Sequence, residues 1–272
     1  MEGIINLEDM FDQDQDDQNC DTVTSYNLGQ HTLQMKSRAL HIGVSRSVWK
    51  ASIALAHYLD KNYQKLALQT DQINQQDLKN QSLKILELGS GPGLSGLYSS
   101  LFFKNAKIFM TDICPKSLNL IKDNIQLNQE LLNRDNLSIN YFEWGNFTRN
   151  QDFEEFYEDK DIKISKELEN IEDQSQSAKV QFPQSCQSQF DLVVASDVVY
   201  IPEFLDPLLK SMQYFLKDQS GRCLMVNNKI RQDLFNDRFD RMLEENNLIA
   251  EVNEEFQLDS DVFRVFILKK AL

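Results

Sequence analysis

The chain has 272 residues, of which 41% are hydrophobic, and a formal net charge of −14 at pH 7. Residues 1–31 hold eight acids and no Lys or Arg, and residues 151–189 hold ten acids against four lysines, so the rest of the chain is neutral. The length suits one domain with appendages. Since phosphate binding depends on clustered Lys and Arg, the composition argues against a nucleic-acid partner.

Several other classes of protein are also disfavoured. No window of about 18 apolar residues exists, so we expect no membrane span, and the acidic, polar start of the chain does not resemble a signal peptide. The three histidines lack metal-ligand spacing, so no metal site is expected, and nothing demands more than a monomer. The four cysteines are scattered without a Cys-x-x-Cys pair and indicate free thiols in a reducing compartment, the cytoplasm and also the nucleus: Cys20, Cys114, Cys186 and Cys223.

The N-terminal part divides into a tail and an extension. Residues 1–24 include D-Q-D-Q-D-D-Q-N-C-D, which has almost nothing to bury, and we predict a disordered acidic tail. A folded domain is predicted over 25–272, with an N-terminal extension over 25–68. Within this extension, residues 25–36 favour a small hairpin and residues 47–59 a helix with one apolar face.

After a polar linker over 69–81, strand and helix patterns alternate to the C-terminus. This alternation predicts an α/β fold, with a mostly parallel seven-stranded sheet, helices on both faces and an antiparallel strand pair at one edge. An acidic, low-complexity insert over 151–189 interrupts the alternation after the third strand. The predicted strands cover 83–88, 107–111, 137–142, 191–195, 222–227, 249–256 and 262–268, and the helices 94–103, 115–128, 203–216 and 232–245.

The sequence L-E-L-G-S-G-P-G-L-S-G joins the first of these strands to its helix. Gly89, Gly91 and Gly93 place bare backbone N–H groups and a helix N-terminus where a nucleotide can approach closely. The run from Gly91 to Gly96 also fits the dinucleotide fingerprint, with Asp112 about twenty residues further on. Taken alone, the loop does not separate a nicotinamide dinucleotide from S-adenosylmethionine.

Three features favour S-adenosylmethionine. Glu87 lies two residues before the first glycine, where a carboxylate can hold the ammonium end of a methionine moiety through a water or a backbone group. Trp144 directly follows the third strand, where its ring can lie against adenine. The closing strand pair lacks the second mononucleotide half that a dinucleotide requires.

Four further side chains have two interpretations each. Asp112 can accept hydrogen bonds from both ribose hydroxyls or cap the helix that starts near Pro115, and both can hold. Trp49 fits either a core position or the mouth of a cofactor pocket, which would give its indole N–H a partner. Asp197 and Tyr200 follow the fourth strand, where ligands bind in open α/β sheets, so they face the transferred group or cap the next helix.

These pieces together resemble the family-16 protein-lysine methyltransferases, seven-β-strand enzymes that modify non-histone proteins. The resemblance runs from about residue 25 to the C-terminus, apart from the linker and the insert. It includes H-T-L-Q-M, G-V-S-R-S-V-W-K-A-S-I-A-L-A-H-Y-L, L-E-L-G-S-G-P-G-L-S-G, T-D, N-I-Q-L-N, E-W-G and A-S-D-V-V-Y. The sequence departs from the family in its long insert and in Ser196, which stands where Ala is common.

The resemblance implies roles for individual residues. Asp197 and Tyr200 match the family's Asp-x-x-Tyr/Phe signature near the substrate and are the expected catalytic residues. The implied cofactor contacts are Trp49, Gly89, Ser90, Gly91, Asp112, Trp144 and Ser196, to which the loop itself adds Glu87 and Gly93.

The expected reaction is therefore methyl transfer from S-adenosylmethionine to a lysine of a non-histone protein, and the acidic insert favours a basic protein. Three alternatives stay open. One is methylation of arginine or of a small molecule, and the second is a module that binds S-adenosylmethionine or a partner without catalysis. A nicotinamide enzyme is the third.

Overall fold

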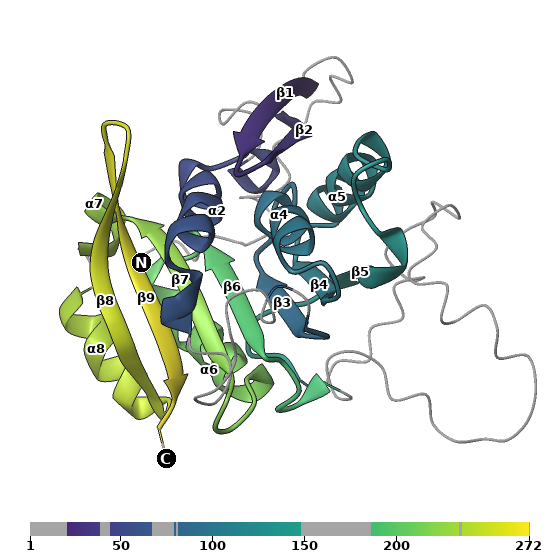
Figure 1. Cartoon of the computed structure of the whole chain (residues 1–272). Coiled ribbons are helices and arrows are strands. Elements are labelled where there is room, and N and C mark those ends of the chain that lie inside the picture. The colour runs from purple at the N-terminus through teal and green to yellow at the C-terminus, as the bar shows by residue number, and fades with distance from the viewer. Residues whose placement is uncertain are drawn as a thin grey trace, which may run out of the picture.

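A computed structural model describes residues 21–38, 44–66, 79, 81–147, 186–233 and 236–271. The expected tail up to residue 20, most of the linker, and the insert up to residue 185 lie outside the described residues. Within them, strands and helices alternate as predicted and build one seven-stranded sheet with helices on both faces (Figure 1). A separate two-stranded sheet lies beside it.

The large sheet confirms the predicted fold class. Its first five strands in the spatial order are parallel, and β9 runs antiparallel to both of its neighbours. The strand order turns back on itself between β3 and β6, because the chain moves outward from β3 to β5 and then returns. In spatial order the strands are β5 (Leu137–Tyr141), β4 (Lys107–Asp112), β3 (Lys84–Leu88), β6 (Leu192–Ser196), β7 (Arg222–Asn228), β9 (Asp261–Lys270) and β8 (Leu248–Leu258).

Alternate residues of the central strands face opposite layers of the core, as the two-residue period of a strand requires. Ile85 packs with the helices of one face, and its neighbour Leu86 packs with those of the other. The first face carries α2 (Lys50–Asn62), α4 (Leu94–Phe102) and α5 (Pro115–Leu127), and the second carries α6 (Leu205–Phe215) and α8 (Asn236–Glu245). The central strands β3, β6 and β7 are therefore buried on both faces, whereas the edge strands β5 and β8 are partly exposed.

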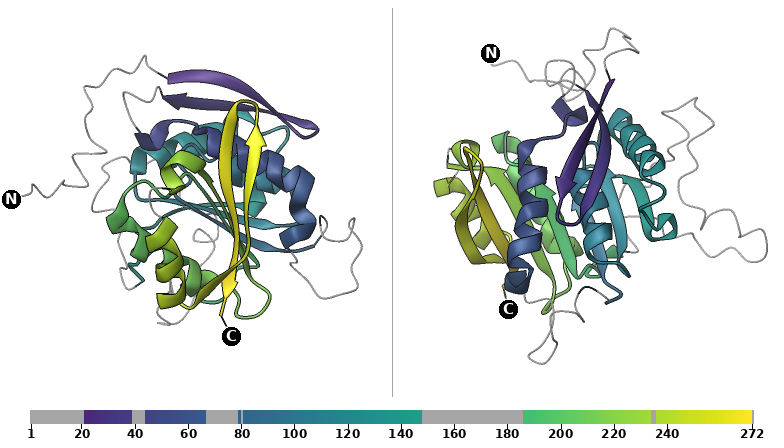
Figure 2. Two further views of the ribbon diagram at one scale, coloured as in Figure 1. Left: turned by 90° about the vertical axis from the view of Figure 1, so that its left-hand side faces the viewer. Right: turned by 45° about the horizontal axis from the view of Figure 1, so that its top comes forward.

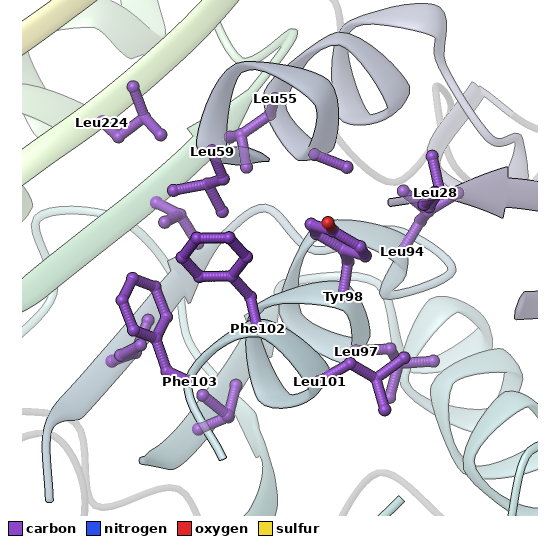
Figure 3. Close-up of a cluster of buried hydrophobic side chains, with 14 of the residues drawn as sticks. Leu28, Leu55, Leu59, Leu94, Leu97, Tyr98, Leu101, Phe102, Phe103 and Leu224 are labelled. Carbon is purple, nitrogen blue, oxygen red and sulfur yellow. The ribbon is translucent and has the colours of Figure 1, made fainter. Parts of the chain in front are cut away.

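The packing of α2 on α4 fixes the segment that leads into α2. Leu55 and Leu59 of α2 point toward Tyr98 and Phe102 of α4, and all four side chains are buried (Figure 3). The Tyr98 hydroxyl also donates a hydrogen bond to Asp60 of α2, which links the two helices. Because this packing fixes the start of α2, it also fixes the position of Trp49, the residue directly before the helix.

The small sheet is a hairpin of β1 (Asp21–Leu28) and β2 (His31–Arg38), and it lies across the outer side of the helices (Figure 2). The outer edge of β2 is hydrogen-bonded to the side chains of Asn124 in α5 and of Asn128, the residue that follows α5. Lys36 donates its backbone N–H to Oδ1 of Asn124 (2.6 Å) and accepts a hydrogen bond from Nδ2 of the same residue (3.0 Å). Asn128 repeats the pattern with Gln34 at 2.9 and 2.7 Å. Two amides one helical turn apart thus match two residues of the strand.

Three of the boundaries that differ from the predictions have a visible cause or consequence. β1 begins at Asp21, inside the stretch expected to be tail, because Arg38 of the partner strand holds Asp21 through its Nε (2.7 Å). In the region of the helix predicted over 232–245 the structure describes α7 (Lys229–Asp233), which begins three residues earlier, and α8, with residues 234–235 outside the described part. The helix predicted from residue 47 begins at Lys50, after a 3-10 turn, η1 (Val44–Arg46). No described helix is long and apolar enough to span a membrane.

Candidate active site

A cavity of about 610 Å³ opens where β3, β4 and β6 end at the same edge of the sheet. Open α/β sheets bind ligands at this edge, where the strand order reverses. The structure brings most of the predicted site residues to this cavity. Those that line it are Trp49, Gly89, Ser90, Gly91, Asp112, Trp144, Ser196, Asp197 and Tyr200.

The glycine loop lines the cavity and lies directly against η1. Gly91 has a φ of +52°, a conformation that glycine adopts without strain. A Cβ atom at this position would lie 2.9 Å from the carbonyl oxygen of Ser45 in η1. A side chain would therefore push η1 away from the loop and open the wall that η1 forms.

Asp112 stands at the end of β4 and joins the loop to the start of α5. Its Oδ2 accepts the N–H of Gly91 and its Oδ1 the N–H of Cys114, both at 2.8 Å. Its burial raises the pKa of the carboxyl to about 6. A carboxylate has about four lone-pair sites, so two remain for a ligand. The bond to Cys114, directly before α5, supports the helix start as well, so both interpretations of this residue are compatible with the geometry.

Glu87 and Gly93, in contrast, do not line the cavity. Glu87 is fully buried beneath the loop, and its Oε2 accepts the N–H of Gly96 in α4 (3.1 Å). Burial raises the pKa of this carboxyl to about 8. Glu87 does not reach the cavity because its side chain points from β3 into the layer between the sheet and α4. Gly93 packs against Ile121 and shapes the turn into α4.

Asp197 directly follows β6 and has a left-handed backbone, with a φ of +56°. Its Oδ1 accepts the backbone N–H of Asn228 (3.0 Å) and its Oδ2 accepts a hydrogen bond from Nη2 of Arg231 (2.5 Å). Burial raises the pKa of this carboxyl, and the guanidinium of Arg231 opposes that rise. The Arg231 guanidinium also lies over the Trp49 ring, 4.6 Å from its centroid. On the cavity wall, the Arg231 guanidinium therefore contacts the Trp49 ring and is ion-paired with Asp197.

The sequence reasoning missed Arg231, although a usable signal exists. It lies three residues after the end of β7, which is parallel to β6, so its helix begins at the same edge of the sheet as Asp197. The side chains of Asn227 and Gln232 are hydrogen-bonded (2.9 Å) and hold α7 against the end of β7.

Trp144, Tyr200 and Phe204 also line the cavity and form an aromatic wall. Phe204, which the sequence reasoning also missed, makes edge contacts with Trp144 and with Tyr200, at centroid distances of 6.4 and 6.5 Å. Burial and the nearby Asp112 raise the pKa of the Tyr200 phenol to about 12. Tyr200 therefore stays protonated at neutral pH and can donate a hydrogen bond or pack against a ligand.

The cavity lining carries four carboxylates and one guanidinium, so it favours a positively charged ligand. Asp112 and the side-chain-free glycines of the loop suit a ribose with an attached chain, and the aromatic wall suits a flat base. These features fit S-adenosylmethionine, a cationic nucleoside. No group of three His, Cys, Asp or Glu that could hold a metal ion occurs in the described part of the chain. The four acids are Asp112, Glu143, Asp197 and Glu203, and the sequence reasoning missed Glu143 and Glu203.

Comparison with known proteins gives a consistent result. A family model described as lysine methyltransferase matches residues 27–159 and 151–246. Protein N-lysine methyltransferase METTL21A of Xenopus tropicalis is 22% identical over 245 residues, which cover 90% of this chain and 87% of that protein. The METTL21A protein of Danio rerio is 22% identical, covering 88% and 85%. EEF1A lysine methyltransferase 3 of Xenopus tropicalis is 24% identical, covering 71% and 61%.

Proposed function

The chain belongs to the lysine methyltransferase family, whose cofactor is S-adenosylmethionine, and we propose that it methylates a lysine side chain of a non-histone protein. The observation that carries this proposal is the position of Asp197. Its carboxylate lies on the wall of the same cavity as the glycine loop and Asp112. A relative named as an EEF1A lysine methyltransferase supports a non-histone acceptor.

On the cofactor side, the residues of this chain bind and orient. S-adenosylmethionine, when bound, supplies a methyl group on a positively charged sulfur. Asp112 accepts hydrogen bonds from its ribose hydroxyls, and Gly89 and Gly91, which have no side chain, let its amino-acid end approach the loop closely. Trp49 and Trp144 provide aromatic surface for the adenosine part. Ser90 and Ser196 complete the polar lining.

On the acceptor side, only a neutral amine has the lone pair that the reaction needs. Removing the proton from a lysine with a pKa of about 10.4 costs about 4.6 kcal/mol at pH 7. Asp197 captures and aims the incoming ammonium group, and the proton then leaves to water. Tyr200 walls the channel and offers its ring face to the cation. Alignment of the amine is the larger contribution, since near-attack geometry supplies about 7–11 kcal/mol.

The charge of the site supports a basic protein as the acceptor. The lining of the cavity has three more negative than positive side chains, and the whole chain has a net charge of −14. An acidic surface attracts a basic segment over several ångströms and repels nucleic acid. We further propose that the enzyme acts as a monomer in the cytoplasm and also in the nucleus, where its scattered cysteines remain reduced.

Labelling a cell lysate tests the acceptor. The enzyme is incubated with tritiated S-adenosylmethionine and a lysate depleted of histones, and the labelled proteins are hydrolysed to amino acids. We expect the label in methylated lysine, and none with Asp197→Ala. Label in methylarginine or in the small-molecule fraction would point to the alternative acceptors. Binding of S-adenosylmethionine without any labelling would indicate a binding module.

A further inference from the structure

Arg231 and Asp197 form an ion pair at the acceptor side of the cavity. The Asp197 side chain is only 4% exposed, whereas that of Arg231 is 30% exposed. Oδ1 of Asp197 is held by the backbone of Asn228 and Oδ2 by the guanidinium. The carboxylate therefore meets the cavity as part of a neutral pair, with lone pairs left for one more donor.

A second contact keeps the guanidinium in place. It lies over the Trp49 ring at 4.6 Å, and a flat guanidinium stacks on an aromatic face in a way that a lysine ammonium does not. Two contacts therefore hold Arg231: the carboxylate of Asp197 in the loop after β6 and the indole of Trp49 in the segment before α2. An arginine also keeps its charge at every physiological pH, so the pair stays neutral throughout.

The ion pair reduces a conflict between the negative charge of Asp197 and the neutral amine that the reaction needs. A carboxylate without a partner, placed within about 4–6 Å of a lysine, favours the ammonium form and raises the amine pKa by about 1–3 units. The reaction needs the opposite, a neutral amine. A carboxylate whose charge is already balanced can still accept a hydrogen bond from the amine without stabilising the ammonium form as strongly.

We propose, on the premise of the proposed function, that Arg231 is a positioning residue that holds Asp197 and cancels its charge, so that the acceptor lysine can lose its proton. The proton leaves to water. The lone pair of the amine then forms the new N–C bond while the C–S bond breaks, and the sulfonium becomes a neutral thioether.

The other charged groups near this pair come from several elements. Lys229 and Asp233, also on α7, pair with each other, and Arg264 of β9 adds a second bond to Asp233. The remaining titratable groups of the cavity lining are the same in every Arg231 variant, so a change in pH dependence isolates the ion pair. These groups are Asp112 at the end of β4, Glu143 after β5, Tyr200 after β6 and Glu203 in η7 (Pro202–Phe204).

The test compares the pH dependence of kcat in Arg231→Met and in the wild type. The acceptor is the protein identified by tritium labelling, both substrates are saturating, and the pH runs from 6.5 to 9.5. We expect kcat of the variant to be at least about tenfold lower at pH 7 and its pH profile to be displaced to higher pH by about one unit or more. The ratio of the two rates shrinks once the pH passes the pKa of the bound amine in the wild type. Arg231→Lys keeps the positive charge and should bring the ratio at pH 7 back to within about threefold.

Lys229→Met is the matched control, because it removes the same charge from α7 at a side chain that does not line the cavity. Its kcat profile should follow the wild type. Two kcat profiles that level off at the same pH would reduce Arg231 to a structural support and overturn the inference, as would a ratio near one at pH 7. If Arg231→Met does not fold, a profile of Arg231→Lys displaced by a full unit would equally overturn it. A wild type that labels no lysine would instead defeat the proposed function.

Discussion

At the scale of single residues, the site contains two buried carboxylates whose partners give them different tasks. Asp112 accepts two backbone N–H groups, which are neutral, and so keeps its charge and two lone-pair sites for a ligand. Asp197 is bound to a guanidinium, so its charge is balanced before any substrate arrives. We therefore expect Asp112 to control cofactor affinity and Asp197 to control turnover.

Replacing Asp197 with Asn tests this division. Asn tolerates the left-handed backbone at this position, so the fold should be preserved. We expect kcat to fall by about 100-fold, because the amine is no longer aimed. The affinity for S-adenosylmethionine, measured by isothermal titration calorimetry, should stay within about threefold. An equal loss of affinity would make Asp197 a cofactor residue instead.

The pKa of Asp112 predicts a pH dependence of cofactor binding. Because this carboxyl has a pKa of about 6 in the ligand-free protein, it becomes protonated as the pH falls below that value and loses acceptor sites. The Kd for S-adenosylmethionine should rise below pH 6 by up to about tenfold per unit. In Asp112→Asn the Kd should be higher at neutral pH and flat between pH 5 and 7. A wild-type Kd that is flat over this range would contradict the assignment.

Glu87 predicts a pH dependence of stability. Its pKa rises from the ordinary 4.5 to about 8 in the folded chain, so between these values the folded state binds one more proton than the unfolded state. Stability therefore falls as the pH rises through this window. Glu87→Gln removes the effect, so its advantage in free energy of unfolding over the wild type should grow by about 4 kcal/mol from pH 5 to pH 8. Urea unfolding at both pH values measures it.

The same Glu87→Gln protein checks whether this residue contacts the cofactor. Its side chain lies beneath the loop and outside the cavity, so the Kd for S-adenosylmethionine should stay within about threefold of the wild type. A large increase in Kd would support the contact that the sequence suggested.

At the scale of elements, the hairpin is attached by the amides of α5, and Asn124 is the key residue. Besides its bonds to Lys36 it donates to the carbonyl oxygen of Pro92 in the glycine loop (2.9 Å). Asn124→Ala leaves an N–H and two carbonyl oxygens without their partner, which should lower the free energy of unfolding by about 3 kcal/mol. Urea unfolding measures this. Gln126→Ala, an exposed change on the same helix, should cost less than about 0.5 kcal/mol.

The sequence predicted the alternation of elements because strand and helix periods are local properties. It placed the end of β4 within a residue, since T-D closes an apolar run. It placed the start of the helix after β7 at residue 232 instead of Lys229, because the hydrogen bond from Asn227 to Gln232 that holds α7 there joins two elements. The start of β1 also depended on a distant partner, Arg38.

At the scale of the whole molecule, the sequence predicted the residues that end parallel strands, because the topology brings those ends to one edge. The sequence could not show which way a side chain points, and that direction decides whether the side chain lines the cavity. Glu87 belongs to a strand that leads to the cavity, but its side chain turns into the core. Arg231 and Phe204 lie on short helical segments without a motif, and the one sequence signal for Arg231 is its place three residues after a parallel strand.

The charge of the whole chain predicts a salt effect on the acceptor. A net charge of −14 with an acidic cavity attracts a basic protein through long-range forces that salt screens. Raising the ionic strength from about 0.05 to 0.3 M should increase the KM for the protein acceptor several-fold and leave kcat nearly unchanged. The Kd for S-adenosylmethionine serves as the control. A KM that does not respond to salt would contradict a basic acceptor.

The left-handed backbone at Asp197 restricts how this position can change in evolution. Gly, Asn and Asp accept such a conformation at low cost, while bulky or β-branched residues do not. A lineage that abandons catalysis but retains the fold should therefore drift to Asn or Gly here. In a genome survey, either residue directly after the fourth parallel strand would mark candidate pseudoenzymes.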